Sequence, residues 1–214
     1  MRRKYTHLLF DHDGVLVDTE PLYYRATEQV LDNIGIELDL AQYLKWMAVG
    51  ENAWQLARRA EHSEEQIDHY RTQRNRIYQQ FLIEQDIEIP GVVDLLRKLK
   101  RRFSLAIVTT ARRADFNLIH AERDIVAQVE FVLAREDYVL SKPQPDPYLL
   151  ALDRFGINAD QALVIEDSQR GLMAAYAAGI DCAVVHNAFT ATQNFDKATY
   201  RLADLRQLEQ VLAS

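Results

Sequence analysis

The sequence predicts an α/β fold, namely a doubly wound, mostly parallel sheet with an all-helical domain inserted after the first strand. Short apolar runs of strand length alternate with amphipathic helical patterns along most of the chain. One stretch, from about Glu20 to Ile87, holds helical patterns only. Several apolar runs also stop abruptly at polar residues, which is typical of strands whose carboxyl ends border a ligand site.

Five apolar runs have the length and β-branched content of fully buried strands, and they span residues 7–10, 105–108, 131–134, 162–165 and 180–185. The spacing of apolar residues predicts helices over residues 92–99, 148–155, 171–178 and 204–212. Asp167 and Ser168 are candidates to cap the third of these helices. Repeated strand–helix alternation implies a parallel sheet that is covered on both faces.

The inserted stretch has amphipathic patterns over residues 23–34, 40–47, 54–60 and 64–82, and Ser63 with Gln66 has the spacing of a capping box. We therefore divide the chain into a core, residues 1–17 and 88–214, and a helical cap, residues 18–87. Aromatic and basic residues of the cap are candidates for substrate contacts, namely Tyr23, Tyr24, Trp46, Trp54, Arg58 and Arg74. Their helical spacing indicates that most of them are core or surface residues.

The composition favours a small molecule as the partner. The chain has 214 residues, enough for a substantial core and a small accessory domain. Its net charge of −7 argues against nucleic acid and anionic membranes, which select basic patches. We expect a monomer or a weak dimer.

The chain shows no targeting segment of a recognised kind. The basic start, Met1 to Lys4, is followed by a short apolar run that is far below the length of a signal peptide's apolar region. The single cysteine, Cys182, excludes an internal disulfide and lies in an apolar run, where a thiol acts as a small hydrophobic group. We expect a cytoplasmic protein.

Polar residues follow three of the predicted strands directly. They are Asp11 to Gly14, Thr109-Thr110, and Glu166 to Ser168. If these strands are neighbours, four carboxylates share one crevice and require a cation, because like charges at such distances repel strongly. Oxygen ligands without a histidine or cysteine set select a hard ion, and Mg²⁺ is the usual one for a phosphate substrate.

Two aspartates separated by one residue can perform different tasks. On an extended segment Asp11 and Asp13 point the same way, so one can attack as a nucleophile while the other donates a proton to the leaving oxygen. Lys142, before a proline-rich segment, would supply positive charge to the nucleophile and to phosphoryl oxygens.

Four segments resemble the motifs of haloacid dehalogenase-like hydrolases, in order and spacing that cover nearly the whole chain. Asp-His-Asp-Gly-Val-Leu-Val-Asp-Thr-Glu (residues 11–20) resembles the first motif, and Ile-Val-Thr-Thr (107–110) the second. Ser-Lys-Pro-Gln-Pro-Asp-Pro (141–147) is similar to the third, and Val-Ile-Glu-Asp-Ser-Gln-Arg-Gly (164–171) to the fourth. The resemblance implies a Rossmann-like core and a mobile cap that closes over the substrate.

The resemblance also implies roles for individual residues. Asp11 would form an aspartyl-phosphate, Asp13 would act as general acid and then as base, and Thr109 and Lys142 would hold the phosphoryl group. Thr110 and Ala111 would contribute main-chain N–H groups to the phosphate.

A magnesium site is implied at the same position. Its ligands would be the Asp11 carboxylate, the main-chain carbonyl of Asp13, and Asp167, with Glu166 as a ligand or directly behind the ligands.

Three residues near these motifs, His12, Arg112 and Arg113, are assigned no catalytic role. His12 stands where the family commonly has Leu, Met or Phe, and its side chain should point away from the nucleophile and pack against a neighbouring strand. Arg112 and Arg113 could aid phosphate binding, but a solvated first helical turn is an equal alternative.

Members of this superfamily catalyse several different reactions, so the reaction must be inferred from individual residues and not from the fold. A dehalogenase needs neither a metal nor an acid at Asp13, and Lys45 is too late in the cap for the Schiff-base lysine of a phosphonatase. Phosphate monoester hydrolysis of a small phosphorylated metabolite is therefore favoured.

The main alternative is a sugar phosphomutase that resembles β-phosphoglucomutase. Tyr23 stands near the position of that group's cap histidine, and residues 50–53 lack its cap arginine, so a phosphatase is preferred. A phosphate-binding regulator without catalysis is a third possibility, which the complete set of expected catalytic residues disfavours. The sequence leaves open which phosphate ester is the substrate.

Overall fold

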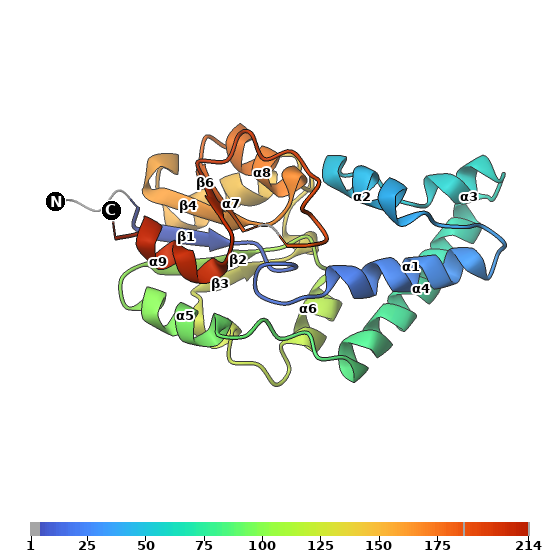
Figure 1. The fold of residues 1–214 in the computed structure, drawn as a ribbon, viewed down its shortest axis with the longest axis horizontal. Coiled ribbons are helices and arrows are strands. Elements are labelled where there is room, and N and C mark those ends of the chain that lie inside the picture. The colour runs from blue at the N-terminus through green and yellow to red at the C-terminus, as the bar shows by residue number, and fades with distance from the viewer. Residues whose placement is uncertain (1–4, 186, 214) are drawn as a thin grey trace.

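The computed structural model describes residues 5–185 and 187–213, so the basic start of the chain lies outside the described residues. Six parallel strands form one sheet in the order β3-β2-β1-β4-β5-β6 (Figure 1). Their bounds are His7–Phe10 (β1), Ser104–Val108 (β2), Phe131–Leu133 (β3), Ala162–Glu166 (β4), Asp181–Val185 (β5) and Tyr200–Leu202 (β6). The predicted doubly wound α/β fold is confirmed.

The sixth strand was not predicted. The first five correspond to the predicted apolar runs within one residue at most ends, but β6 has three residues at the edge of the sheet and includes the exposed Arg201. An edge strand needs little apolar content because only one neighbour pairs with it. Apolar periodicity therefore carries no signal for it.

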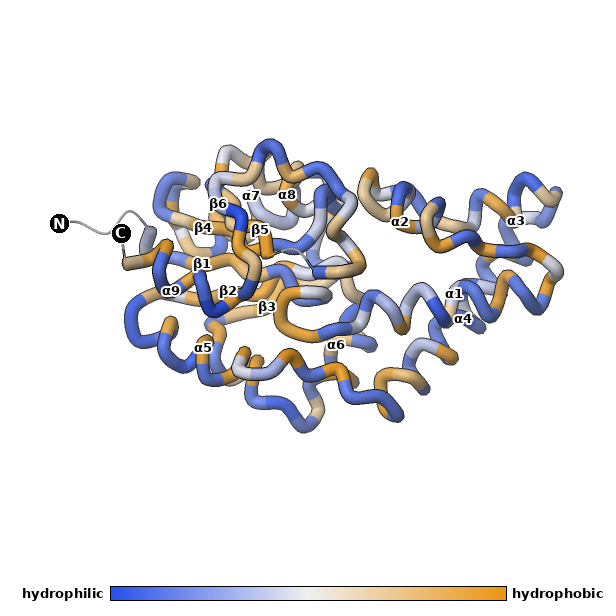
Figure 2. Tube along the Cα trace, viewed as in Figure 1, coloured by the Kyte–Doolittle hydropathy of each residue, from blue (hydrophilic) through white to orange (hydrophobic). Residues whose placement is uncertain are grey.

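Helices cover both faces of the sheet. Alternate strand residues point to opposite faces, so Leu8 and Phe10 pack on one side and Leu9 on the other. The first side is covered by α5 (Val92–Lys100), α6 (Arg113–Ile119) and α9 (Leu208–Val211). The second is covered by α7 (Asp146–Phe155) and α8 (Gln169–Ala177). Figure 2 shows the hydrophobic strands enclosed by helices of mixed hydropathy.

The stretch between β1 and α5 is helical, as predicted. It contains α1 (Glu20–Asp32), α2 (Leu40–Val49), α3 (Gln55–Arg59) and α4 (Glu64–Glu84). These helices enclose a separate hydrophobic cluster that includes Trp46, Trp54 and Ile67. The predicted capping box at the start of α4 is confirmed, because Ser63 and Gln66 exchange side-chain and backbone hydrogen bonds. We call α1–α4 the cap helices.

The end of the chain differs from the single helix that was predicted over residues 204–212. A 3₁₀ turn, Leu205–Gln207, precedes the four-residue α9. Asp204 caps this turn by accepting a hydrogen bond from the Arg206 backbone N–H. Three further 3₁₀ turns lie in connections, at Val126–Gln128, Arg135–Asp137 and Ala159–Gln161. Within the described residues, no helix is long and apolar enough to cross a membrane.

Candidate active site

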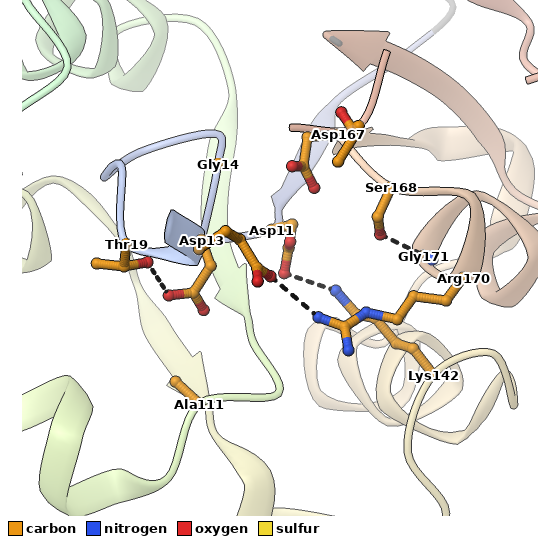
Figure 3. Close-up of polar contacts among 12 residues, drawn as sticks. Asp11, Asp13, Gly14, Thr19, Ala111, Lys142, Asp167, Ser168, Arg170 and Gly171 are labelled. Atoms are coloured by element: carbon orange, nitrogen blue, oxygen red, sulfur yellow. Dashed lines mark hydrogen bonds and ion pairs between the residues drawn. The ribbon is translucent and has the colours of Figure 1, made fainter. Parts of the chain in front are cut away.

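The three strands with polar ends are neighbours in the sheet. β1 lies between β2 and β4, with Phe10 level with Ile107 and Ile165, so Asp11 emerges beside the ends of both neighbours. From β1 the chain runs outward through β2 and β3 and then crosses to β4, β5 and β6 on the other side of β1. The strand order therefore reverses between β1 and β4, and ligands bind at such a switch point in doubly wound folds. The expected gathering is present, because Lys142 links Asp11 to Glu166 and the Thr109 hydroxyl donates to Asp13. Figure 3 shows Asp11, Lys142 and Asp167 of this cluster.

Lys142 lies at the centre of the cluster. Its Nζ donates to Asp11 Oδ1 at 2.7 Å, to Glu166 Oε1 at 2.6 Å and to the Val108 carbonyl at 2.9 Å. Burial alone would lower the pKa of Lys142, but Asp11 and Glu166 raise it above its usual value. The lysine is therefore a fixed positive charge against Asp11, the carboxylate that the sequence predicts to be the nucleophile.

The carboxylates around this lysine are crowded. Burial and the charge of Glu166 raise the pKa of Asp11 to about 6, although Lys142 opposes the shift. Burial, together with Asp11 and Glu166, raises the pKa of Asp167 well above its usual value. One lysine therefore does not neutralise the cluster, and a further cation would relieve the repulsion.

Oxygens of Asp11, Glu166 and Asp167 lie within 4.8 Å of one another, which is a spacing that can hold a metal ion. Glu166 already has protein partners for both oxygens. Its Oε1 accepts from Lys142 and, at 2.7 Å, from the Tyr148 hydroxyl, and its Oε2 accepts from the Ser168 hydroxyl at 3.0 Å. Asp11 and Asp167 are thus the better placed metal ligands, with Glu166 behind them, and an all-oxygen set suits Mg²⁺.

Close packing fixes Asp167 and Glu166. A Cβ at Gly14, whose φ is +77°, would lie 2.1 Å from Asp167 Oδ2, and a Cβ at Gly171 would lie 1.8 Å from Glu166 Oε1. Asn187 Nδ2 donates to Asp167 Oδ2 at 3.0 Å. Both glycines of the first and fourth motifs therefore leave room for carboxylates.

Asp13 points toward Thr19 rather than Asp11 (Figure 3). It accepts hydrogen bonds from the hydroxyls of Thr19 and Thr109, the latter at 3.3 Å. Burial would raise the pKa of Asp13, but His12, Thr19 and neighbouring charge hold it below its usual range. In this conformation the Asp13 carboxylate is charged and faces Thr19 and Thr109.

The end of β2 supplies Thr109, Thr110 and Ala111. The Thr109 hydroxyl accepts from the Ala111 N–H at 2.9 Å, and the Thr109 carbonyl accepts from the Tyr138 hydroxyl at 2.8 Å. Thr110 and Ala111 line the cavity described below. Next to them, the guanidinium of Arg112, the residue before α6, donates two 2.8 Å hydrogen bonds to the Asp115 carboxylate.

His12 is fully buried, but its packing partner is a helix and not a strand as was expected. Its ring contacts Phe116 of α6 and His120, the residue that follows this helix, and the Nε2 atoms of the two histidines are 2.8 Å apart. Its Nδ1 lies 3.3 Å from Asp13 Oδ2. Because α6 covers the face of the sheet to which Leu8 and Phe10 also point, a side chain on that face meets this helix first.

A cavity of about 400 Å³ separates the strand ends from the cap helices. Asp13, Thr110 and Ala111 line the end formed by the core, and Tyr23 and Arg74 line the opposite wall. Arg170 donates to Glu20 at 3.2 Å between the two parts, and burial raises the pKa of Glu20 to about 7 although Arg170 opposes the shift. This volume is in the range of small-molecule sites.

Sequence reasoning missed several residues of the site. Glu20 and Arg170 lay within the quoted motifs but were given no role, whereas Tyr148 was only part of a helical pattern. Asn187 comes from a loop after β5 that carries no apolar period. Their contacts depend on tertiary approach, for which the sequence holds no local signal.

Comparison with known proteins agrees with this geometry. Residues 8–185 match the family model of haloacid dehalogenase-like hydrolases. A fructose-1-phosphate phosphatase of Escherichia coli, YqaB, is 28% identical over 183 residues, which are 85% of this chain and 96% of that protein. A phosphorylated carbohydrates phosphatase of Thermotoga maritima is 28% identical over 188 residues, which are 84% of this chain and 85% of its own.

A solved structure supports the same assignment. CbbY from Rhodobacter sphaeroides in complex with xylulose 1,5-bisphosphate superposes with a TM-score of 0.82 at 25% identity, covering 95% of this chain and 96% of that one. The family model, the sheet order and the strand-end carboxylates agree. The chain belongs to the haloacid dehalogenase-like hydrolases.

Proposed function

We propose that this hydrolase cleaves a small phosphate monoester, a sugar phosphate or a similar metabolite, with Mg²⁺ and with Asp11 as the nucleophile. The observation that carries the proposal is the buried arrangement of Lys142 between Asp11 and Glu166 at the strand ends. The phosphatase activities in the names of the relatives support the same chemistry.

In the first step, an oxygen of Asp11 attacks phosphorus and the bond between phosphorus and the ester oxygen breaks. The leaving oxygen takes a proton from the carboxyl group of Asp13. Asp13 must therefore turn from Thr19 toward the substrate and bind a proton on the way, and the cavity lies on that side.

In the second step, a water molecule attacks the phosphorus of the aspartyl-phosphate, and Asp13 accepts the water's proton. The bond between phosphorus and Asp11 breaks, which releases inorganic phosphate and restores the carboxylate. Lys142 remains beside Asp11 in both steps and offsets negative charge on the phosphoryl oxygens.

We assign the Mg²⁺ site to the carboxylates of Asp11 and Asp167 and the main-chain carbonyl of Asp13, with Glu166 orienting Lys142 from behind. When bound, Mg²⁺ would offset charge on the phosphoryl group and on the attacking oxygen. The crowding of the three buried carboxylates supports this assignment.

We further propose that Thr109, through its hydroxyl, and Thr110 and Ala111, through main-chain N–H groups, hold the phosphoryl oxygens. For this the Ala111 N–H would exchange its hydrogen bond to the Thr109 hydroxyl for one to the phosphate. The cap, residues 18–87, would exclude water from the cavity while the aspartyl-phosphate forms. Residues 1–17 and 88–214 would form the catalytic core.

A panel of phosphorylated metabolites with purified enzyme and Mg²⁺ tests the proposal. We expect release of inorganic phosphate from p-nitrophenyl phosphate and from at least one sugar phosphate, and loss of both activities in EDTA. Absence of phosphate release from every compound would contradict it. Conversion of β-glucose 1-phosphate to glucose 6-phosphate, with the bisphosphate activator present, would identify a mutase instead.

A further inference from the structure

Two cations are buried among the described residues, and they differ in their partners. Lys142 contacts two carboxylates, Asp11 and Glu166. Arg74 of α4 is only 7% exposed, yet no carboxylate of the described residues lies within ion-pair distance of it. Since a guanidinium does not lose its proton in a protein, this charge is buried and uncompensated.

The Arg74 side chain is held in place by neutral groups. Its guanidinium carbon lies 4.0 Å from the centre of the Tyr23 ring and 5.8 Å from that of Trp54. Its Nε donates to Asn75 at 3.0 Å, and Nη1 donates to Thr27 at 3.4 Å. These contacts orient the fork of the guanidinium but leave its charge without an anion.

The other arginines that line the same cavity are neutralised or solvated. Arg71 pairs with Asp68, Arg112 with Asp115 and Arg170 with Glu20. Arg135 is exposed to solvent. Arg74 is therefore distinct among these five cations, and it lies in the cap wall opposite the strand ends.

We propose that the substrate carries a second anionic group, a phosphate or a carboxylate, which Arg74 binds at the end of the molecule away from the phosphate that is hydrolysed. This inference rests on the proposed function, because it assigns the reacting phosphate to the strand ends. A planar guanidinium binds either anion through two parallel hydrogen bonds. The substrate class is thus a bisphosphorylated sugar or a phosphorylated carboxylic acid.

Matched pairs of substrates test this proposal directly. The first pair is fructose 1,6-bisphosphate, with loss of the 1-phosphate measured, and fructose 1-phosphate. The second pair is 2-phosphoglycolate and ethyl phosphate, which lacks the carboxylate. We define the selectivity of each pair as kcat/KM for the doubly anionic substrate divided by kcat/KM for its singly anionic counterpart. A larger selectivity in the first pair indicates that the second anion is a phosphate, and a larger selectivity in the second pair indicates a carboxylate.

We expect wild-type selectivity of at least about 10 in one pair, and a loss of roughly 10- to 100-fold in Arg74→Met, the range for hydrogen bonds to a charged group. Arg74→Lys, which keeps the charge without the fork, should give an intermediate ratio. Arg76→Met changes an exposed arginine on the same helix and should leave both ratios unchanged. Melting temperatures verify that each variant is folded.

Binding in the absence of turnover separates this inference from the proposed function. In Asp11→Asn, fructose 1,6-bisphosphate or 2-phosphoglycolate should raise the melting temperature more than its singly anionic counterpart does, and adding Arg74→Met should remove the difference. No hydrolysis of any compound would overturn the proposed function alone. Equal selectivity in wild type and Arg74→Met, or equal stabilisation by both members of each pair, would overturn the role of Arg74.

Discussion

The two ends of the cavity, the strand ends and the cap wall, differ in how their buried charges are paired. At the strand ends, each group has a partner within the chain, since Lys142 contacts Asp11 and Glu166, and Tyr148 and Ser168 contact Glu166. At the cap wall, the partners of the buried Arg74 guanidinium are the aromatic ring of Tyr23, the amide of Asn75 and the hydroxyl of Thr27, all of them uncharged. The buried cation of the first end is paired with carboxylates of the chain itself, whereas the buried cation of the second has no anionic partner among the described residues. If both proposals hold, chemistry and recognition reside in separate parts of the chain.

The largest effect should come from the nucleophile itself. Asp11→Asn removes the attacking charge but not the volume, so we expect a loss of ~10³-fold or more in kcat for p-nitrophenyl phosphate with the fold retained by circular dichroism. Asp153→Asn, at an exposed position on α7, should keep full activity. Wild-type activity in Asp11→Asn would show that Asp11 is not the nucleophile.

Magnesium should stabilise the core end specifically. An ion at Asp11 and Asp167 relieves the repulsion between buried carboxylates, so a concentration of about 100 times its Kd should raise the free energy of unfolding by about 2.7 kcal/mol. Differential scanning calorimetry of wild type and Asp167→Asn, with Mg²⁺ and with EDTA, measures the effect. An equal rise in both proteins would place the ion elsewhere.

Gly171→Ala tests how tightly the core end is packed. Alanine is favoured over glycine in a helix, yet its Cβ would lie 1.8 Å from Glu166 Oε1, so we expect a loss of about 1–3 kcal/mol in the free energy of unfolding. Urea denaturation measures this loss, and kcat should fall with it because Glu166 also orients Lys142. An increase in stability would mean that Glu166 has room to move.

The contact between the cap helices and the core can be tested at Gly50, the residue that follows α2. A Cβ there would lie 2.8 Å from Pro143 of the core, whereas one at Gly35, in the loop after α1, would meet nothing within 4 Å. Both residues have positive φ, 79° and 75°, so alanine costs each about 1–2 kcal/mol in stability.

Only Gly50→Ala should also hold the cap helices away from the core, with a further loss of roughly tenfold in kcat/KM. Steady-state kinetics of the two variants with one substrate decide the matter. If Gly35→Ala loses as much activity as Gly50→Ala, backbone strain rather than cap contact explains the result.

The sequence identified the core end far better than the cap wall, for a physical reason. A buried parallel strand is a continuous apolar run, and its end is marked by the first polar residue, so Asp11, Thr109 and Glu166 could be brought together from strand ends alone. Lys142 follows no strand, and only its proline-rich context and the motif order pointed to it.

The cap wall has no comparable marker. Arg74 lies on a helix with arginines at 71 and 76 as well, and only tertiary packing decides which of these becomes buried. The packing of His12 against α6 could not be predicted for the same reason, and neither could the short edge strand β6. Local periodicity describes an element, whereas these features depend on which elements approach each other.

The cap helices leave and rejoin the core at one place. Val17 forms an antiparallel bridge with Glu88, and the Asp18 N–H donates to the Ile87 carbonyl at 3.0 Å. The segment that enters the cap helices is therefore hydrogen-bonded to the segment that leaves them. A segment with adjoining ends can be exchanged as a cassette without redirecting the sheet beneath it. Evolution can therefore revise what this fold recognises by replacing one contiguous piece, while the machinery at the strand ends is inherited unchanged.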